Sequence, residues 1–168
     1  MKIVASVGRT AWLAALLIAA AASPATAAQD SAEGPDRSQW RFIADLDTSG
    51  IMINTDMDDG PDETRLVTAY MVLATPHASG VDGISTRYSV SCRTETITDL
   101  GGTMYQGATE RGPSAPQNEG QPIQVHTGTV FGVIGDYACN GRLPRIGNRR
   151  LTGRASAIEY VRERLASD

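Results

Sequence analysis

The chain has 168 residues, of which 41% are hydrophobic and 20% charged, and its formal net charge at pH 7 is −4. This length suits one domain with a single core. Two cysteines and two histidines, His77 and His126, with none of the short paired spacings of zinc sites, argue against a metal centre. We expect no cofactor and no specific nucleic-acid partner.

The first 28 residues have the pattern of a secretory signal peptide. Lys2 and Arg9 supply positive charge, residues 10–22 (TAWLAALLIAAAA) form an apolar run, and small residues near position 28 allow cleavage. The run is short for a membrane span, and no cysteine at the cleavage site could carry a lipid. We therefore expect a signal peptide over residues 1–28 and a periplasmic or secreted protein. An N-terminal anchor that is never cut is the alternative.

Polar residues with Gly and Pro then predict a flexible leader over 29–39. Beyond it, apolar residues recur at every second position, which is typical of half-buried strands. The expected strands are 40–45, 51–55, 65–75, 84–92 and a short one at 101–107, the last two being joined as a hairpin through 99–102. Residues 108–122 lack periodicity and are rich in Gly, Pro, Ser and Asn, so they predict a surface loop.

The segment 56–63 concentrates five acidic residues between two expected strands. Calcium prefers several loop oxygens, but aligning Gly60 with the glycine of the twelve-residue calcium loop puts Thr55, Met57 and Leu66 at ligand positions. We therefore favour a solvated loop that protects a sheet edge from aggregation over a weak calcium site.

A helix is predicted from about residue 130 to residue 140. Val130, Val133, Ile134 and Tyr137 form one helical stripe. Thr129 is the expected N-cap, and Asn140-Gly141 the expected end.

Cys92 and Cys139 are expected to form a structural disulfide. In an oxidising compartment, two thiols in a small exported domain are most simply joined. The bond would close a loop of about 47 residues, for which chain entropy predicts a stabilisation of about 4 kcal/mol. A catalytic pair would need a Cys-x-x-Cys spacing or a thiol beside His or Lys, and the sequence offers neither.

Residues 142–168 hold seven arginines and three acidic residues. Such a segment can bind an anionic surface, but a solvated segment lying against the acidic body of its own domain is the favoured interpretation. We expect an unpacked connection and then a short C-terminal helix with a capping box at 156–159 and a stripe of Ile158, Val161 and Leu165. This helix either docks on the domain or stays detached.

No catalytic motif is present: the sequence has no Gly-x-Ser-x-Gly elbow, no phosphate loop and no acid beside His77 or His126 that would mark a base. We expect no catalytic residues and no enzymatic activity.

A strand opening on Trp40, a strand ending at Cys92, and HTGTVFGVIGDYAC, in which Thr-Gly-Thr enters a helix ending in a second cysteine, together resemble the surface-adhesin protein E-like domain of bacterial exported proteins. The similarity covers residues 40–141. It implies a small antiparallel β-sheet with one helix packed across a face, and a binding role at the cell surface. The family's namesake looks like a lipid-anchored adhesin that dimerises. This chain departs from it by lacking a lipidated cysteine and by adding the arginine-rich C-terminal extension.

We therefore expect an α+β domain over 40–141, followed by a C-terminal extension over 142–168. Its expected role is a non-catalytic binding or structural module of the envelope or of the secreted fraction. The partner would be a protein or envelope ligand, a homodimer is compatible with this role, and no ligand-binding residue can be assigned. The alternative is a secreted enzyme or a protease-inhibitor-like protein that uses the 108–122 loop.

Overall fold

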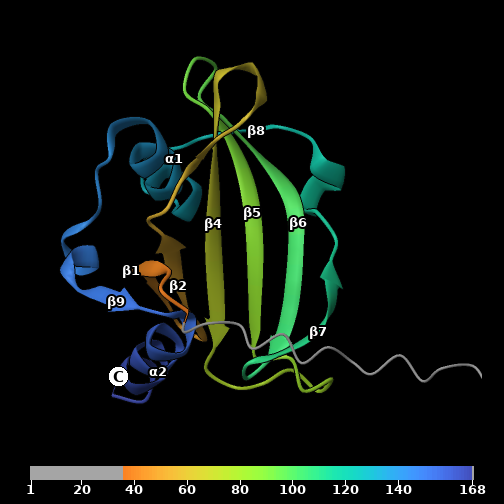
Figure 1. Cartoon of the computed structure of the whole chain (residues 1–168), viewed down its shortest axis with the longest axis vertical. Helices are drawn as coiled ribbons and strands as arrows, with labels where there is room; N and C mark the ends of the chain where they lie inside the picture. Colours follow the sequence, from red (N-terminus) through yellow and green to blue (C-terminus); the bar gives the residue numbers. More distant parts are fainter. Residues whose placement is uncertain (1–35, 168) are drawn as a thin grey trace, which may run out of the picture. The chain divides into compact units, whose positions relative to one another are not determined.

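The computed structural model describes residues 36–167, apart from the side chains of residues 147 and 148. The expected signal peptide (1–28) and residues 29–35 of the expected leader lie outside this range. The described chain is an antiparallel β-sheet with two α-helices, which confirms the α+β class, although the sheet dominates (Figure 1). Within the same range, no helix has the length and apolar character that a membrane span requires.

Nine strands of the described chain form one sheet, larger than the small sheet expected. Their bounds are β1 Gln39–Leu46, β2 Ser49–Asn54, β3 Asp58–Asp59, β4 Thr64–Leu73, β5 Gly83–Ser91, β6 Thr96–Gln106, β7 Thr109–Ser114, β8 Ile123–Gln124 and β9 Arg150–Thr152. Seven strands follow the order β7-β6-β5-β4-β2-β1-β9, while β3 pairs with β4 and β8 pairs with β6. All these pairs are antiparallel.

The β5–β6 hairpin turns at residues 92–95, so the turn expected at 99–102 is wrong. Strand β6 continues without a break through Gly101 and Gly102. A Cβ on Gly102 would lie 1.7 Å from the carbonyl oxygen of Ser85, and Gly101 has a φ of +81°. The two glycines therefore serve a bulge and a close backbone approach inside a strand, which sequence alone does not distinguish from a turn.

The expected surface loop over 108–122 is partly an edge strand. β7 pairs with β6, and the 3-10 turn η2 (Gln117–Gly120) follows. The buried Asp99 carboxylate accepts hydrogen bonds from the backbone N–H groups of Gly101 (2.7 Å) and Gln117 (3.0 Å). Residues of this segment are thus held to the sheet by backbone pairing and by a buried acid.

Helix α1 (Val130–Asn140) has the predicted caps. The Thr129 hydroxyl accepts a hydrogen bond from the N–H of Gly132 (3.0 Å), and Gly141 ends the helix with a φ of 66°. The N–H of Gly141 donates to the Tyr137 carbonyl (2.8 Å). These contacts satisfy backbone groups that a helix leaves unpaired at its ends.

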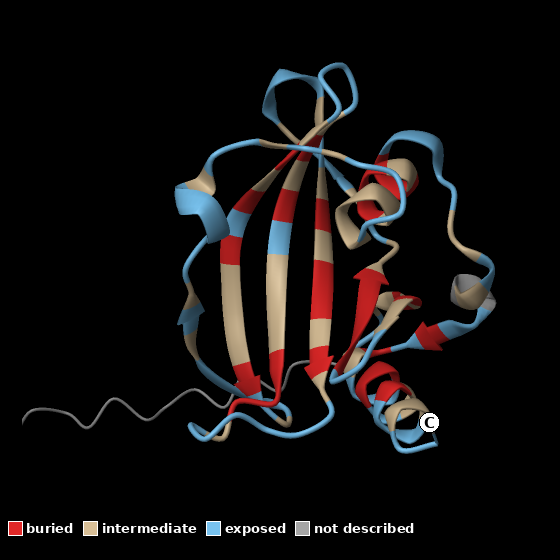
Figure 2. Cartoon of the chain, turned by 180° about the vertical axis from the view of Figure 1, so that it is seen from behind, coloured by how far each residue is buried: buried red, intermediate tan, exposed pale blue. Residues whose placement is uncertain are grey.

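The two helices lie on opposite faces of the sheet. Neighbouring residues of a strand point to opposite faces, and in β2 Ile53 packs in the core cluster that includes α1, whereas Met52 packs in the cluster that includes α2 (Arg154–Leu165). Figure 2 shows buried positions on both helices and along the central strands. The core is therefore double, with the central strands shared between its two halves.

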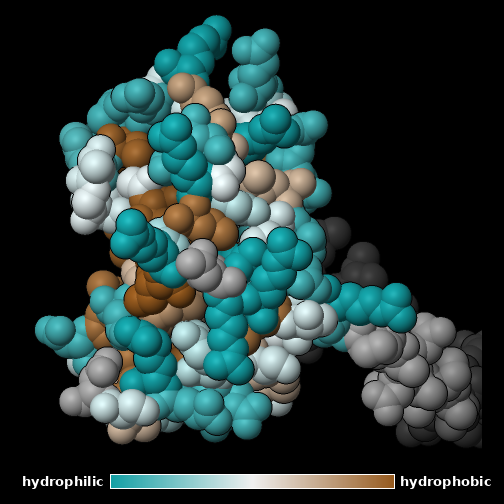
Figure 3. Space-filling model, turned by 90° about the vertical axis from the view of Figure 1, so that its left-hand side faces the viewer, coloured by the Kyte–Doolittle hydropathy of each residue, from teal (hydrophilic) through white to brown (hydrophobic). Residues whose placement is uncertain are grey.

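Residues 142–167 belong to the same compact unit as residues 36–141. β9 pairs with β1, bringing Leu151 opposite Trp40. Leu143 packs against the α1 side of the core and Ile146 against the α2 side, so the connection passes around this edge of the sheet. Figure 3 shows this side, where apolar surface gathers between hydrophilic side chains. The expected unpacked connection is therefore wrong: its apolar residues, isolated among arginines and glycines, show no periodicity.

Helix α2 begins at Arg154, before the capping box expected at 156–159. The carboxylate of Asp36 accepts a hydrogen bond from the N–H of Arg154 (2.7 Å), and the Ser38 carbonyl accepts one from the N–H of Gly153 (2.8 Å). Residues 36–39, expected in the flexible leader, thus cap this helix from a distant part of the chain.

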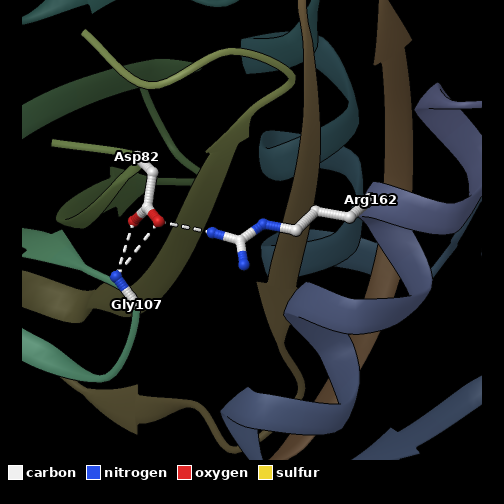
Figure 4. Close-up of polar contacts among 3 residues, drawn as sticks. All are labelled: Asp82, Gly107 and Arg162. Atoms are coloured by element: carbon white, nitrogen blue, oxygen red, sulfur yellow. Dashed lines mark hydrogen bonds and ion pairs between the residues drawn. The ribbon is translucent and has the colours of Figure 1, made fainter. Parts of the chain in front are cut away.

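The C-terminal half of α2 is attached through two carboxylates, one in the β4–β5 connection and one in β1. Arg162 pairs with Asp82, which also accepts the N–H of Gly107 at 2.9 Å (Figure 4). Arg164 pairs with Asp45 at 2.7 Å. Asp82 is only 8% exposed, so it links α2, the β4–β5 connection and the β6–β7 turn. The helix therefore docks on the domain, one of the two outcomes considered from sequence.

Replacing Asp36 by alanine should lower the free energy of unfolding by about 1 kcal/mol at pH 7, the usual cost of a lost helix cap. Burial raises the pKa of Asp36, but hydrogen bonds from Arg154 and Ser38 outweigh it and hold the pKa below the ordinary 3.8. The cap's contribution is therefore fully present above pH 3.8 and is lost as pH falls through the lowered pKa. Urea unfolding at pH 7 and pH 3 measures this, and an equal difference at both pH values would contradict it.

Tyr70 is 1% exposed, its hydroxyl lacks a hydrogen-bond partner in the described structure, and burial raises its pKa to about 12. Tyr70→Phe should leave the free energy of unfolding at pH 7 unchanged or raise it by up to about 1 kcal/mol, because an unpaired buried hydroxyl is costly. In the wild type, the stability tied to neutral Tyr70 is present below pH 10 and is lost as pH rises toward 12. The variant should lose less stability between pH 9 and 11, and a less stable variant at pH 7 would count against this account.

Candidate functional site

An open groove of about 650 Å³ lies beside helix α1 and is called the α1 groove here. Its lining comes from the end of β5, from Glu95, from parts of 125–128 and 140–144, and from one side of α1. Ligand pockets usually measure about 300–1,000 Å³ and combine apolar walls with a few polar groups. The α1 groove has this size and mixture: valines line it together with two acidic residues and one arginine.

Two glycines bring the wall formed by 125–128 close to α1. A Cβ on Gly132 would lie 2.3 Å from the carbonyl oxygen of His126, and one on Gly135 would lie 3.0 Å from Cγ1 of Val125. Helix glycine costs about 1 kcal/mol relative to alanine. At these two positions glycine permits a close approach of the 125–128 segment to the helix, which fixes one side of the groove.

The Cys92–Cys139 disulfide is part of the groove lining. The two sulfurs are 2.02 Å apart and the two Cα atoms 5.5 Å, in agreement with the pairing expected from sequence. Cys92 follows β5 and Cys139 lies in the last turn of α1. Both residues are exposed, so the bond joins sheet and helix at the surface, where apolar burial alone would hold them weakly.

Three charged side chains line the groove. Glu95 ends the β5–β6 turn with a φ of 52°, and its carbonyl accepts hydrogen bonds from the N–H of Val125 (2.8 Å) and the amide of Gln124 (3.0 Å). Asp136, on α1, accepts a hydrogen bond from the Asn140 side chain (2.7 Å). Arg142 follows the end of α1. The backbone under Glu95 is thus tied to the neighbouring wall.

Neither histidine lines the α1 groove. Nδ1 of His77 lies 3.0 Å from the Ser79 hydroxyl in an exposed loop. The side chain of His126 is exposed, while its carbonyl accepts a hydrogen bond from the Thr129 hydroxyl (2.7 Å). The structure keeps the two histidines in separate local turns.

The acidic segment 56–63 contains β3, which pairs with β4, and a 3-10 turn. Asp59 pairs with Arg65, and Asp58 lies 3.4 Å from Arg87. Within residues 36–167, no group of three or more His, Cys, Asp or Glu side chains is placed to hold a metal ion. The segment is a largely exposed hairpin arm, and two of its five acidic residues contact arginines.

Most C-terminal arginines contact their own domain. Besides the ion pairs of α2, the guanidinium of Arg149 lies 4.8 Å from the Tyr160 ring centre and that of Arg154 lies 4.1 Å from the Tyr105 ring centre. Arg145 and Arg150 are exposed. Four of the seven arginines thus hold the C-terminal segment to its own domain. That the segment also binds an anionic surface stays a prediction.

The disulfide was predictable from the sequence, but the groove around it was not. Glu95, Thr127, Asp136 and Arg142 were not singled out, because they come from segments that become neighbours only through the disulfide and the α1 packing. The spacing of Gly132 and Gly135 along one side of the helix was the available signal.

Comparisons with protein-family models, with curated proteins and with solved structures found no match. The resemblance to the surface-adhesin protein E-like family therefore stays a prediction.

Replacing both cysteines by serine should lower the free energy of unfolding by about 4 kcal/mol, since the bond closes a 47-residue loop. Because both cysteines are exposed, serine leaves no buried cavity. Amides of α1 should then exchange with deuterium faster than those of α2, which the disulfide does not hold. Guanidinium unfolding and hydrogen exchange measure the two effects. Equal loss of protection in both helices would contradict a local role.

Proposed function

We propose that this chain is an exported, non-catalytic binding module, and that its ligand occupies the α1 groove. The observation that carries the proposal is the groove itself, an open hollow of about 650 Å³ whose walls combine valines, glycine backbone and three charged side chains. Small-molecule and peptide sites are concave and mostly apolar, with a few polar groups that fix orientation.

The construction of the walls supports binding with little reorganisation. The disulfide ties α1 to β5, the glycine contacts tie the 125–128 segment to α1, and the backbone bond between Val125 and Glu95 ties that segment to the hairpin. A site that is already ordered loses less conformational entropy when it binds, which leaves more of the contact energy as affinity.

The groove chemistry favours binding over catalysis. Its two cysteines are joined to each other, and its serine, Ser91, accepts a hydrogen bond from the Thr94 hydroxyl (2.9 Å). A nucleophile with an adjacent base is the usual arrangement for covalent catalysis, and the described lining residues do not include a histidine to serve as that base.

Export is proposed from the signal-peptide pattern of residues 1–28 together with the disulfide, which persists in oxidising compartments. The likeness of residues 40–141 to the surface-adhesin protein E-like domain supports the same compartment and a binding role. Host adhesion is not part of the proposal.

The proposal is tested by screening short peptides and oligosaccharides against the nitrogen-15-labelled protein by NMR. Ligands should shift the amides of Gly128, Val133 and Asp136. Thr127→Trp, which places a large side chain on an exposed residue of the groove, should weaken binding at least about tenfold, or by about 1.4 kcal/mol.

Thr109→Trp is the matched control, because Thr109 is also exposed but lies on β7, outside the groove. It should leave the affinity unchanged. Shifts that map to another surface, a Thr127→Trp variant that binds as well as the wild type, or the absence of groove shifts with the entire panel would overturn the proposal.

A further inference from the structure

We propose that the α1 groove selects a zwitterionic ligand, namely a short apolar peptide with a free ammonium and a free carboxylate. This inference rests on the proposed function and specifies the ligand class of the same site. In it, the carboxylate of Glu95 receives the ammonium and the guanidinium of Arg142 receives the carboxylate.

The two charged residues have equivalent positions relative to the disulfide. Glu95 comes three residues after Cys92, and Arg142 comes three residues after Cys139. The bond between the cysteines therefore brings one negative and one positive side chain to the same groove from two distant segments. Charges of opposite sign, held on separate segments, match a ligand that carries both signs.

Neither charge is neutralised within the described chain. The ion pairs of residues 36–167 join Arg65, Arg87, Arg162 and Arg164 to aspartates, and neither Glu95 nor Arg142 takes part in them. Both residues are exposed, so they remain hydrated until a ligand arrives. A ligand with only one charge would satisfy one of these groups and meet the other as a like charge, which is unfavourable.

Asp136 gives the groove a second carboxylate. One of its oxygens accepts the Asn140 side-chain amide, and a carboxylate has further lone pairs that can accept from an ammonium. Valines 90, 125 and 133 lie in the same lining, so the body of the ligand should be apolar. Together these features describe a small aliphatic peptide whose two ends are both charged.

The test uses free-ended peptides of one to four alanine and valine residues, together with the same peptides N-acetylated, C-amidated or capped at both ends. Binding to the full mature protein is followed by the shifts of groove amides. Free-ended peptides should bind, with an optimum at one length. Either cap should weaken binding about tenfold or more, as expected for loss of a hydrogen-bonded charge.

Charge-neutral variants assign each end of the ligand. Glu95→Gln should remove the discrimination between free and acetylated N-termini while keeping that between carboxylate and amide, and Arg142→Gln should do the reverse. Glu159→Gln and Arg150→Gln, at exposed positions outside the groove, should keep both preferences. A variant with a damaged structure would weaken the binding of all peptides alike. It would not remove the preference for one free end of the peptide while keeping the preference for the other.

Equal binding of capped and free peptides in the groove would overturn the zwitterion inference and leave the proposed binding function standing. The same holds if groove shifts arise from oligosaccharides alone, or if phosphoethanolamine, a zwitterion without a carboxylate, binds while every peptide fails. A failure of the proposed function itself is recognised separately, by a whole panel that leaves the groove amides unmoved.

Discussion

Strands β1 and β2 of this sheet are buried on both faces, and the rest of the fold follows from that constraint. In β2, Met52 and Ile53 are both fully buried although they point in opposite directions. A sheet with two apolar faces must be covered twice. Helix α1 covers one face and α2 the other, and the chain between them has to pass around a sheet edge. The disulfide holds α1 on its face of the sheet, and the arginine ion pairs hold α2 on the other.

Local signals in the sequence were sufficient for elements whose stabilising groups lie close together along the chain. Helix α1 was predicted with its caps, because Thr129 and Gly141 adjoin it, and β5 was predicted from its alternation. The elements that were missed or misplaced depend on partners far away in the sequence. β9 is three residues long and is recognisable only by its pairing with β1. Helix α2 starts three residues early because its capping group, Asp36, is 118 residues away. The turn misplaced onto Gly101-Gly102 failed because glycine serves turns and close strand contacts alike.

The groove also combines features that the local sequence predicts with features that depend on distant contacts. The cysteines could be paired from composition and compartment, since only two are present. Glu95 and Arg142, three positions after the two cysteines, can be recognised as residues of one groove only after the disulfide pairing is known. Gly132 and Gly135 lower the helix propensity of α1, and the structure gives their compensation, which is the close packing of the 125–128 segment. Two glycines that are unfavourable in a helix, close to a cysteine in the sequence, were therefore the signal for the position of the groove.

The sequence distance between α2 and the strands that it covers also bears on when the domain can fold. The helix packs on Trp40, Phe42 and Met52 but is made more than a hundred residues after them. Long-range contacts of this kind are slow to form because the intervening loop must first be closed. A chain whose residues 154–165 have not yet been made lacks the helix that buries that half of its core. Its apolar strands therefore stay exposed to chaperones until those residues arrive, and export of the kind proposed above would use this delay to keep the chain unfolded.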